Sequence, residues 1–304
     1  MIMPENKERK IRLRSRGQIQ ELGPSMLVRG ALPNPDFEYV SPFILLHHIQ
    51  PTVVESGWDH IGVPSHPHKG FITLTYMLDG EFRHRDSSGG SGLIRCGGAQ
   101  WMMTGSGIVH EEMIGEEFAA KGGRMEMLQL WINLPSEFKK HAPYYRIMEE
   151  LELPVIPLGE SGGRIRVLAG SYEGSSSPLK TETPLGIFRV TLHPGGKASL
   201  EGIPQSFNLM GYLTSGALAF GPEKTIVDDG ETILFSNSGD WITLENPGQE
   251  PADLFLFGGE PILEPVVASG PFVMNTREEI QEAYRQFREG QFGLLHPAQK
   301  APQS

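Results

Sequence analysis

The sequence has a single cysteine, Cys96, so no disulfide can form within the chain. One lone thiol suits a reducing compartment. The sequence also lacks any apolar run of about 18 residues, the length that a transmembrane helix requires. Residues 1–7 have no apolar stretch of the kind found in a secretory signal. We therefore expect a cytoplasmic protein that does not associate with membranes.

Positive charge is scarce, with 26 Lys and Arg against 37 Asp and Glu and a net charge of −11. Proteins that bind the nucleic-acid backbone need clusters of Lys and Arg, so we expect no direct nucleic-acid binding. One locally basic run lies within the first 16 residues, and it contains Lys7, Arg9, Lys10, Arg12, Arg14 and Arg16. We interpret this run as a solvated N-terminal segment, and the alternative is a small docking patch for a protein partner.

Glycine (37) and proline (24) are abundant and together make up about a fifth of the 304 residues. Both disfavour helix interiors, which argues against a helical bundle. Short runs of alternating apolar residues are separated by turn residues, as in Ile72–Leu78, where alternate side chains share one face. The pattern predicts an all-β sandwich or barrel. Further strands are predicted at Met125–Ile132, Arg164–Leu168, Gly186–Leu192 and Ala252–Phe257.

A weak internal repeat relates Tyr76–Phe82 to Tyr212–Leu218, at an offset of 136 residues. This offset is about the size of one small β-barrel, so the sequence predicts two tandem copies of one β-domain. We place an N-terminal domain at residues 1–135, a connector with a helical turn at 136–160, and a C-terminal domain at 161–304.

One helix is predicted near the C-terminus. Thr276 and Glu279 form a capping box, in which each side chain satisfies a free backbone amide at the helix start. Ile280, Tyr284 and Phe287 follow on one face, which predicts a helix packed across a barrel.

Two short segments concentrate metal-ligating residues. His66 and His68 are two residues apart, as are His110 and Glu112, so each pair projects to one side of a strand, while Glu111 faces away. On neighbouring strands of a barrel these pairs would supply three imidazoles and one carboxylate. This set suits an octahedral Fe(II), Mn(II) or Ni(II) ion with two open positions. Five unpaired histidines are interpreted as structural or solvated, namely His60, His84, His141, His193 and His296.

Several motifs resemble the signature of the pirin family of the cupin superfamily. The N-terminal motifs are His66–Phe71, Tyr76–Phe82, Gln100–Met102, Gly107–Met113 and Leu128–Pro135, and the C-terminal ones are Gly258–Pro265 and Gly270–Thr276. They occur in consistent order over roughly residues 10–290.

This resemblance implies a bicupin of two tandem barrels with one metal, usually iron, in the N-terminal barrel. The family's ligands fall on His66, His68, His110 and Glu112, and Mn, Ni or Cu could replace Fe(II). Some members cleave flavonols such as quercetin with O₂, so a small aromatic substrate is implied, with Glu112 also serving as catalytic base. Others act as transcription coregulators that respond to the redox state of the iron.

The sequence departs from the family pattern at two positions near the second histidine. Ile72 stands where many members carry Glu, and we expect this change to remove a polar group from around the site. Lys69 stands where Arg is common, and it offers a point charge without a bidentate fork.

Adding the repeat offset to the first histidine pair gives Gly202 and Pro204, whose side chains cannot bind a metal. We therefore expect a metal-free C-terminal barrel. Three hypotheses follow for the whole chain: a flavonol-cleaving dioxygenase, an iron-dependent redox-sensing protein without turnover, and a metal-free structural bicupin.

Overall fold

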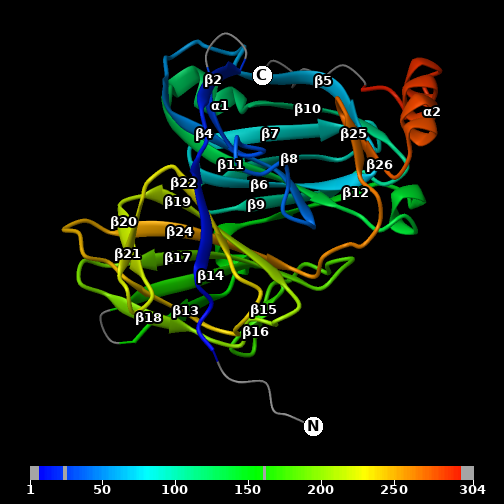
Figure 1. Ribbon diagram of the computed structural model, residues 1–304. Helices are drawn as coiled ribbons and strands as arrows, with labels where there is room; N and C mark the ends of the chain where they lie inside the picture. The colour runs from blue at the N-terminus through cyan, green and yellow to red at the C-terminus, as the bar shows by residue number, and fades with distance from the viewer. Residues whose placement is uncertain (1–6, 23–25, 160–161, 296–304) are drawn as a thin grey trace.

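The protein is described by a computed structural model that covers residues 7–22, 26–159 and 162–295. Within these residues the chain forms two β-barrels, one above the other in Figure 1. The prediction of an all-β fold built from two barrels with a C-terminal helix is confirmed.

The N-terminal barrel combines a large sheet with a small one. The large sheet has the order β12 (Tyr144–Met148), β9 (Ala99–Met103), β6 (Phe71–Asp79), β11 (Gly123–Asn133), β4 (Phe43–Val54), β3 (Met26–Leu32) and β2 (Ile19–Leu22). The small sheet has the order β5 (Gly62–His68), β10 (Ile108–Ile114), β7 (Glu81–Asp86) and β8 (Ser91–Arg95).

The C-terminal barrel has the same design. Its large sheet has the order β1 (Ile11–Arg16), β22 (Glu231–Phe235), β19 (Asn208–Ser215), β24 (Ala252–Gly259), β17 (Leu185–Leu192), β14 (Gly163–Ala169) and β13 (Val155–Pro157). Its small sheet has the order β18 (Lys197–Leu200), β23 (Ile242–Glu245), β20 (Ala217–Phe220) and β21 (Thr225–Asp228). The matching strand orders bear out the predicted repeat, because β6 and β19 occupy the same place.

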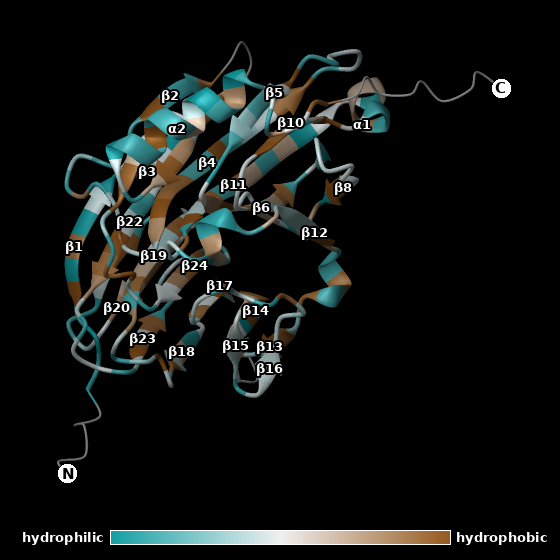
Figure 2. Ribbon diagram, turned by 90° about the vertical axis from the view of Figure 1, so that its right-hand side faces the viewer, coloured by the Kyte–Doolittle hydropathy of each residue, from teal (hydrophilic) through white to brown (hydrophobic). Residues whose placement is uncertain are grey.

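The remaining elements are short, apart from one helix. Two hairpins are formed by β15 (Ser171–Tyr172) with β16 (Ser175–Ser176), and by β25 (Val267–Ser269) with β26 (Phe272–Met274). The helices are α1 (Glu116–Lys121), α2 (Arg277–Arg288) and single 3₁₀ turns at Phe138–Lys140 and Glu150–Glu152. The capping box predicted for α2 is present, and the helix, largely hydrophilic in Figure 2, packs on β25 and β26. The helix α1 was not predicted from the sequence.

Two strands cross the domain boundaries that the sequence predicts. β1 belongs to the first 135 residues, yet it pairs with β22 and completes the C-terminal sheet. β12 belongs to the predicted connector, yet it pairs with β9 and completes the N-terminal sheet. The two strands occupy corresponding edges of the two sheets. Membership of the two sheets therefore does not follow the domain limits at residues 135 and 160, which stay a prediction.

The basic N-terminal run lies along the C-terminal barrel, and five of its six basic side chains are exposed while Arg9 is buried. Arg9 is only 2% exposed, and its guanidinium donates to the carbonyl oxygens of Gly239, Phe207, Ser236 and Pro204 at 2.5–3.3 Å. The prediction of a solvated segment therefore holds for five of the six basic side chains and fails for Arg9.

Neighbouring basic side chains of this run are also engaged. Lys10 lies 3.1 Å from a carboxylate oxygen of Glu223, and Arg14 lies 2.9 Å from one of Glu231. These contacts join the N-terminal segment to the C-terminal barrel at exposed positions.

The two large sheets pack face to face, and the largest hydrophobic core lies between them. Phe43 and Phe257 meet edge to face across it, with ring centroids 5.8 Å apart, as do Tyr76 and Phe255 at 5.5 Å. Such pairs add to the stabilisation from buried apolar area. Each barrel also has its own smaller core.

Strand β6 divides its side chains between two environments. Ile72, Leu74 and Tyr76 enter the core between the sheets, whereas Thr73 and Thr75 have the opposite orientation that period two requires. Ile72 therefore contacts apolar residues on the far side of the sheet from Thr75. The expectation that Ile72 removes a polar group from the ligand region is wrong, since the strand turns this position away from it.

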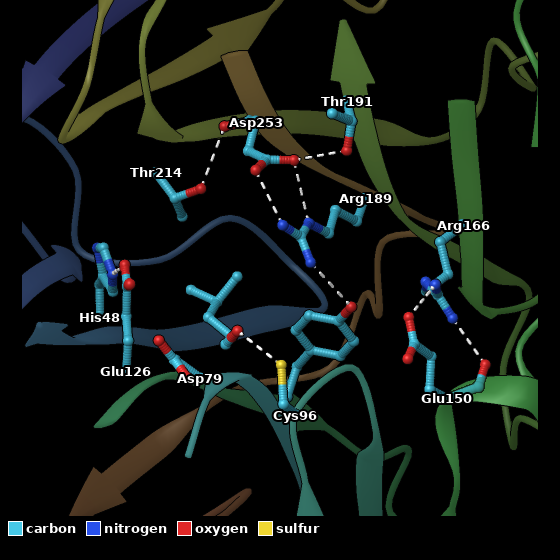
Figure 3. A network of polar contacts seen from close by, with 12 residues as sticks. His48, Asp79, Cys96, Glu126, Glu150, Arg166, Arg189, Thr191, Thr214 and Asp253 are labelled. Atoms are coloured by element: carbon cyan, nitrogen blue, oxygen red, sulfur yellow. Dashed lines mark hydrogen bonds and ion pairs between the residues drawn. The ribbon is translucent and has the colours of Figure 1, made fainter. Parts of the chain in front are cut away.

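Polar residues from both barrels meet at one margin of this core, as Figure 3 shows. Arg189 binds Asp253 through two hydrogen bonds of 3.1 and 2.9 Å, and it donates to the Tyr76 hydroxyl at 3.2 Å. His48 contacts the Glu126 carboxylate and the Tyr212 hydroxyl, each at 2.9 Å. These bonds satisfy polar groups at the margin of the shared core.

No helix among the described residues is long and apolar enough to cross a membrane.

Replacing Arg9 with Met tests the anchoring of β1. We expect the free energy of unfolding to fall by about 3 kcal/mol, because four carbonyl oxygens lose a charged donor in a buried place. Urea denaturation measures this change. Arg12, on β1 itself, is exposed, so Arg12→Met is the control and should stay within about 0.5 kcal/mol of the wild type. Equal losses in both variants would contradict the anchoring role.

Candidate metal centre

The two ligand pairs lie on adjacent strands of the small N-terminal sheet. β5 and β10 run antiparallel, with His110 opposite His66 and Ile108 opposite His68. A register shift follows between His110 and Glu112. The structure therefore brings the two sequence motifs together.

Three imidazole rings converge from these strands. The Nε2 atoms of His66 and His68 are 3.1 Å apart, and the ring of His110 lies 4.2 and 4.9 Å from theirs, centroid to centroid. The opposite nitrogens, Nδ1 of His66 and of His68, lie 2.8 Å from the carbonyl of Pro64 and 3.3 Å from that of Pro271. These carbonyls can only accept, so they assign the ring protons to Nδ1 and leave each Nε2 with a lone pair.

This arrangement fits a metal ion. Two neutral Nε2 atoms that carry lone pairs cannot hydrogen-bond to each other, and the buried Nε2 of His110 also has no hydrogen-bond partner. Ligand atoms of the three histidines lie within 4.8 Å of one another. A shared cation would satisfy all three nitrogens, and backbone carbonyls that orient ligating histidines are typical of metal sites.

Glu112 belongs to a second ligand group, which shares His110 with the first. It forms an overlapping group with His110 and His84, again with ligand atoms within 4.8 Å of one another. Its carboxylate accepts hydrogen bonds from the Thr75 hydroxyl at 3.3 Å and the Gln129 amide at 2.9 Å. Glu112 is buried, and these two donors hold its orientation.

His84 is the important residue that sequence reasoning missed. It is fully buried, and its Nδ1 lies 3.5 Å from Nδ1 of His110. Its Nε2 lies 2.9 Å from the Asp86 carboxylate, and its Nδ1 lies 3.2 Å from the Gln100 amide. The sequence signal was the pair His84 and Asp86 on one face of a strand, but their partner Gln100 lies on another strand.

Burial controls the charge of this cluster. It lowers the pKa of His68 to about 3, with a further contribution from His66. It also lowers the pKa of His110 well below the usual value, with His68, His66 and His84 adding to the effect. Both imidazoles are therefore neutral near pH 7, which is the form that binds metals. Burial opposes the ionisation of Asp86, but hydrogen bonds from His84, Ser88 and Gly90 outweigh it and lower its pKa to about 2.

Aromatic rings cover one side of the imidazoles. Phe71 and Trp131 lie 5.1 Å from His68, and their own rings are 4.3 Å apart. Trp101 and Met103, by contrast, belong to the core between the sheets. The ligands therefore have an apolar wall made by β6 and β11.

The C-terminal segment closes over the site. Pro271, whose carbonyl faces His68, stands between β25 and β26. Buried Lys139 fastens this segment by donating to Gly70 O, Asn133 Oδ1 and Val273 O at 2.6–2.9 Å.

Lys69 provides a further connection to the same segment. Its ammonium donates to Ser106 O at 2.6 Å and to Gln286 Oε1 on α2 at 3.0 Å. Lys69 thus connects the end of β5 to the C-terminal helix. The ammonium group reaches both acceptors, so this role does not require the bidentate fork of an arginine.

The other unpaired histidines lie apart from this cluster. His60, His141 and His193 are exposed, which agrees with their interpretation as solvated. His296 lies outside the described residues. The metal ligand groups found among the described residues all include His110.

Two family models match the chain, Pirin over residues 25–132 and Pirin C-terminal cupin domain over residues 187–293. The chain belongs to the pirin family. Human pirin is 34% identical over 289 residues, which cover 94% of each chain.

Solved structures agree with this assignment. A quercetin 2,3-dioxygenase from Acinetobacter baumannii has a TM-score of 0.89 at 34% identity, covering 95% of this chain and all of the other. A bacterial pirin from Escherichia coli in complex with nickel(II) shares the fold, with a TM-score of 0.63 at 18% identity over 82% of this chain and all of the other.

Replacing Gln129 with Leu tests the support of Glu112. We expect the affinity for Fe(II) or Mn(II) to fall about tenfold or more, because partners that orient a ligand contribute this much to metal binding. Competition with a chelator of known affinity measures the change. Gln50, which bonds the backbone of His48, supplies the matched control Gln50→Leu. Unchanged metal affinity in Gln129→Leu would show that Glu112 needs no such support.

Proposed function

We propose that this pirin binds one divalent transition metal through His66, His68, His110 and Glu112. The observation that carries the proposal is the convergence of three Nε2 atoms without protein hydrogen-bond donors. Three imidazoles and a carboxylate suit Fe(II), and they also accept Mn(II), Ni(II) or Cu(II). The nickel(II) complex of the bacterial pirin supports a transition metal at this fold, and we propose Fe(II) here.

The reaction we propose is the O₂-dependent cleavage of a flavonol such as quercetin. The similarity to a quercetin 2,3-dioxygenase supports this substrate class. A bound metal would acidify a coordinated hydroxyl of the substrate. Ring opening with release of carbon monoxide would follow, as in the flavonol-cleaving members of the family.

Glu112 is the residue we propose as base for the substrate hydroxyl. Its carboxylate is an acceptor held by Thr75 and Gln129, so it can receive a proton without changing its orientation. Phe71 and Trp131 would exclude water from the His68 side and offer aromatic surfaces to a flat substrate. The protein thus supplies an oriented base and an apolar wall that excludes water from the substrate.

Access to this site is open at one ligand. His66 is only half-buried, whereas the other three ligands are buried. A hollow of about 510 Å³ lies against α2 and is lined by Lys69, next to His68, and by Phe292 and Gln286. None of the four proposed ligands lines this hollow, so the case for an aromatic substrate rests on the similarity to the quercetin 2,3-dioxygenase and on the wall of Phe71 and Trp131.

A redox-sensing role without turnover remains the alternative hypothesis, because it requires the same ligands. Its second motive, a basic docking segment, rests on the five exposed basic side chains of residues 7–16. We also propose a cytoplasmic location, on the evidence of the single cysteine.

Metal content tests the ligand assignment. Protein purified without chelators should carry about one iron per chain, and His68→Ala should retain less than about a tenth of it, because a buried ligand is lost. Chelation should lower the stability of the wild type by about 2–3 kcal/mol, since a metal at about 100 times its dissociation constant stabilises the fold by this amount. Elemental analysis and calorimetry measure both. The exposed His141 gives the control His141→Ala, and equal metal in the two variants would refute the assignment.

Turnover of quercetin tests the reaction. Metal-loaded protein should consume O₂ and release carbon monoxide, and Glu112→Gln should lower kcat by about 100-fold or more, because it keeps an oxygen ligand but loses the base. Glu111, which instead pairs with Arg85, supplies the control Glu111→Gln. The absence of carbon monoxide from metal-loaded wild type would reject the dioxygenase and favour the redox-sensing alternative.

A further inference from the structure

The C-terminal barrel replaces the metal ligands with apolar side chains at matching strand positions. In the N-terminal barrel β7 pairs with β10 and β10 with β5, and the C-terminal barrel pairs β20 with β23 and β23 with β18 in the same way. The repeat offset aligns Phe82 with Leu218, which fixes the registers. They set Phe220 in the place of His84, Leu244 in that of Glu112 and Ile242 in that of His110. The place of His66 is taken by Leu200, and not by Gly202 as the repeat offset alone predicts.

The large sheets differ at one further position, where the N-terminal barrel has a tryptophan and the C-terminal barrel has a glycine. Trp131 on β11 lies opposite Thr73 on β6, and Gly258 on β24 lies opposite Leu209 at the matching place on β19. The C-terminal barrel therefore lacks the indole that lines the N-terminal ligand site. On β17, Gly186 lies opposite Gly258, and the ring of Phe188 lies over Gly186, where an added Cβ would come within 2.5 Å of it.

A cavity of about 340 Å³ occupies this place. Gly258 and Gly186 form part of its wall, together with Leu209, Leu256 and the ring of Phe207. A Cβ added at Gly258 would lie 3.3 Å from Phe207. Phe207 matches Phe71 in the repeat, and in the N-terminal barrel Phe71 packs on Trp131 at 4.3 Å. The cavity thus keeps the ring on which an indole packs, without the indole.

We propose that this cavity is a second small-molecule site, which binds an uncharged, flat bicyclic aromatic compound of about the size of indole. The ligand would lie against Phe207, as Trp131 lies against Phe71. The volume falls within the range of small-ligand sites, and the wall is predominantly apolar, as is usual for them. This site is independent of the metal centre and of the flavonol reaction.

The mouth of the cavity favours a neutral ligand with one polar hydrogen. Glu201 stands at the mouth and is exposed, and its carboxylate would repel anions and accept a ring N–H or O–H. The Tyr172 hydroxyl, also in the lining, accepts the amide hydrogen of Glu201 at 3.3 Å, and it has a proton to offer an acceptor on the ligand. The net charge of −11 adds to the exclusion of carboxylate-bearing rings.

Indole itself is the probe for this site. Titration of the metal-loaded full-length protein with indole, followed by calorimetry and ligand-observed NMR, should show one saturable site. Gly258→Leu should weaken binding about tenfold or more, because the new side chain fills the cavity. Phe207→Ala should also weaken binding, by removing the ring that the ligand packs against, and it tests the site should Gly258→Leu fail to fold.

Matched controls separate this site from the metal centre and from general effects. Gly30 on β3 has only one atom within 4 Å of an added Cβ, Pro33 O at 3.7 Å, so Gly30→Leu makes the same change elsewhere and should leave the affinity unchanged. His68→Ala should lose metal and still bind indole. Indole binding that is absent from the wild type, that persists unchanged in Phe207→Ala or a folded Gly258→Leu, or that is lost with His68→Ala would overturn the proposal.

Discussion

The alternation of side chains along β6 is the constraint on which both halves of the molecule depend. Successive residues point to opposite sides of a strand, so one face of β6 joins the core between the barrels while the other supplies Thr75 to Glu112. A shift of one residue would exchange these environments and destroy both. Packing between the barrels and support of the ligands are therefore fixed together, which explains how an all-β fold can be stable and chemically specialised.

Much of the fold and the ligand set could be predicted, because the signals are local. A spacing of two residues places His66 beside His68, and a capping box marks the start of α2, whatever the rest of the chain does. Residues whose role depends on a distant strand could not be predicted. Gln129 supports Glu112 from β11, and the order of strands in a sheet is not visible in one segment. Ile72 was assigned to the ligand region from the family pattern, although alternation along its own strand already places it with Leu74 and Tyr76.

The two barrels show how one architecture can carry different interiors. Corresponding positions are polar and ligand-rich in the N-terminal barrel and apolar in the C-terminal barrel, while the strand order is unchanged. Buried polar groups require partners at every point, so His84, Asp86 and Gln100 form a connected set. An aliphatic interior has no such requirement, and a glycine pair can leave a cavity there without leaving a polar group unsatisfied.

The pairing of β1 with the C-terminal sheet has a consequence for the order in which the barrels fold. Arg9 precedes Gly239, which accepts its hydrogen bond, by 230 residues. The second barrel cannot close until β22 and the segment with Gly239 have been synthesised, and until then β1 has no sheet to join. Contacts so distant in sequence slow folding. The two barrels, although similar in design, therefore do not fold independently of each other.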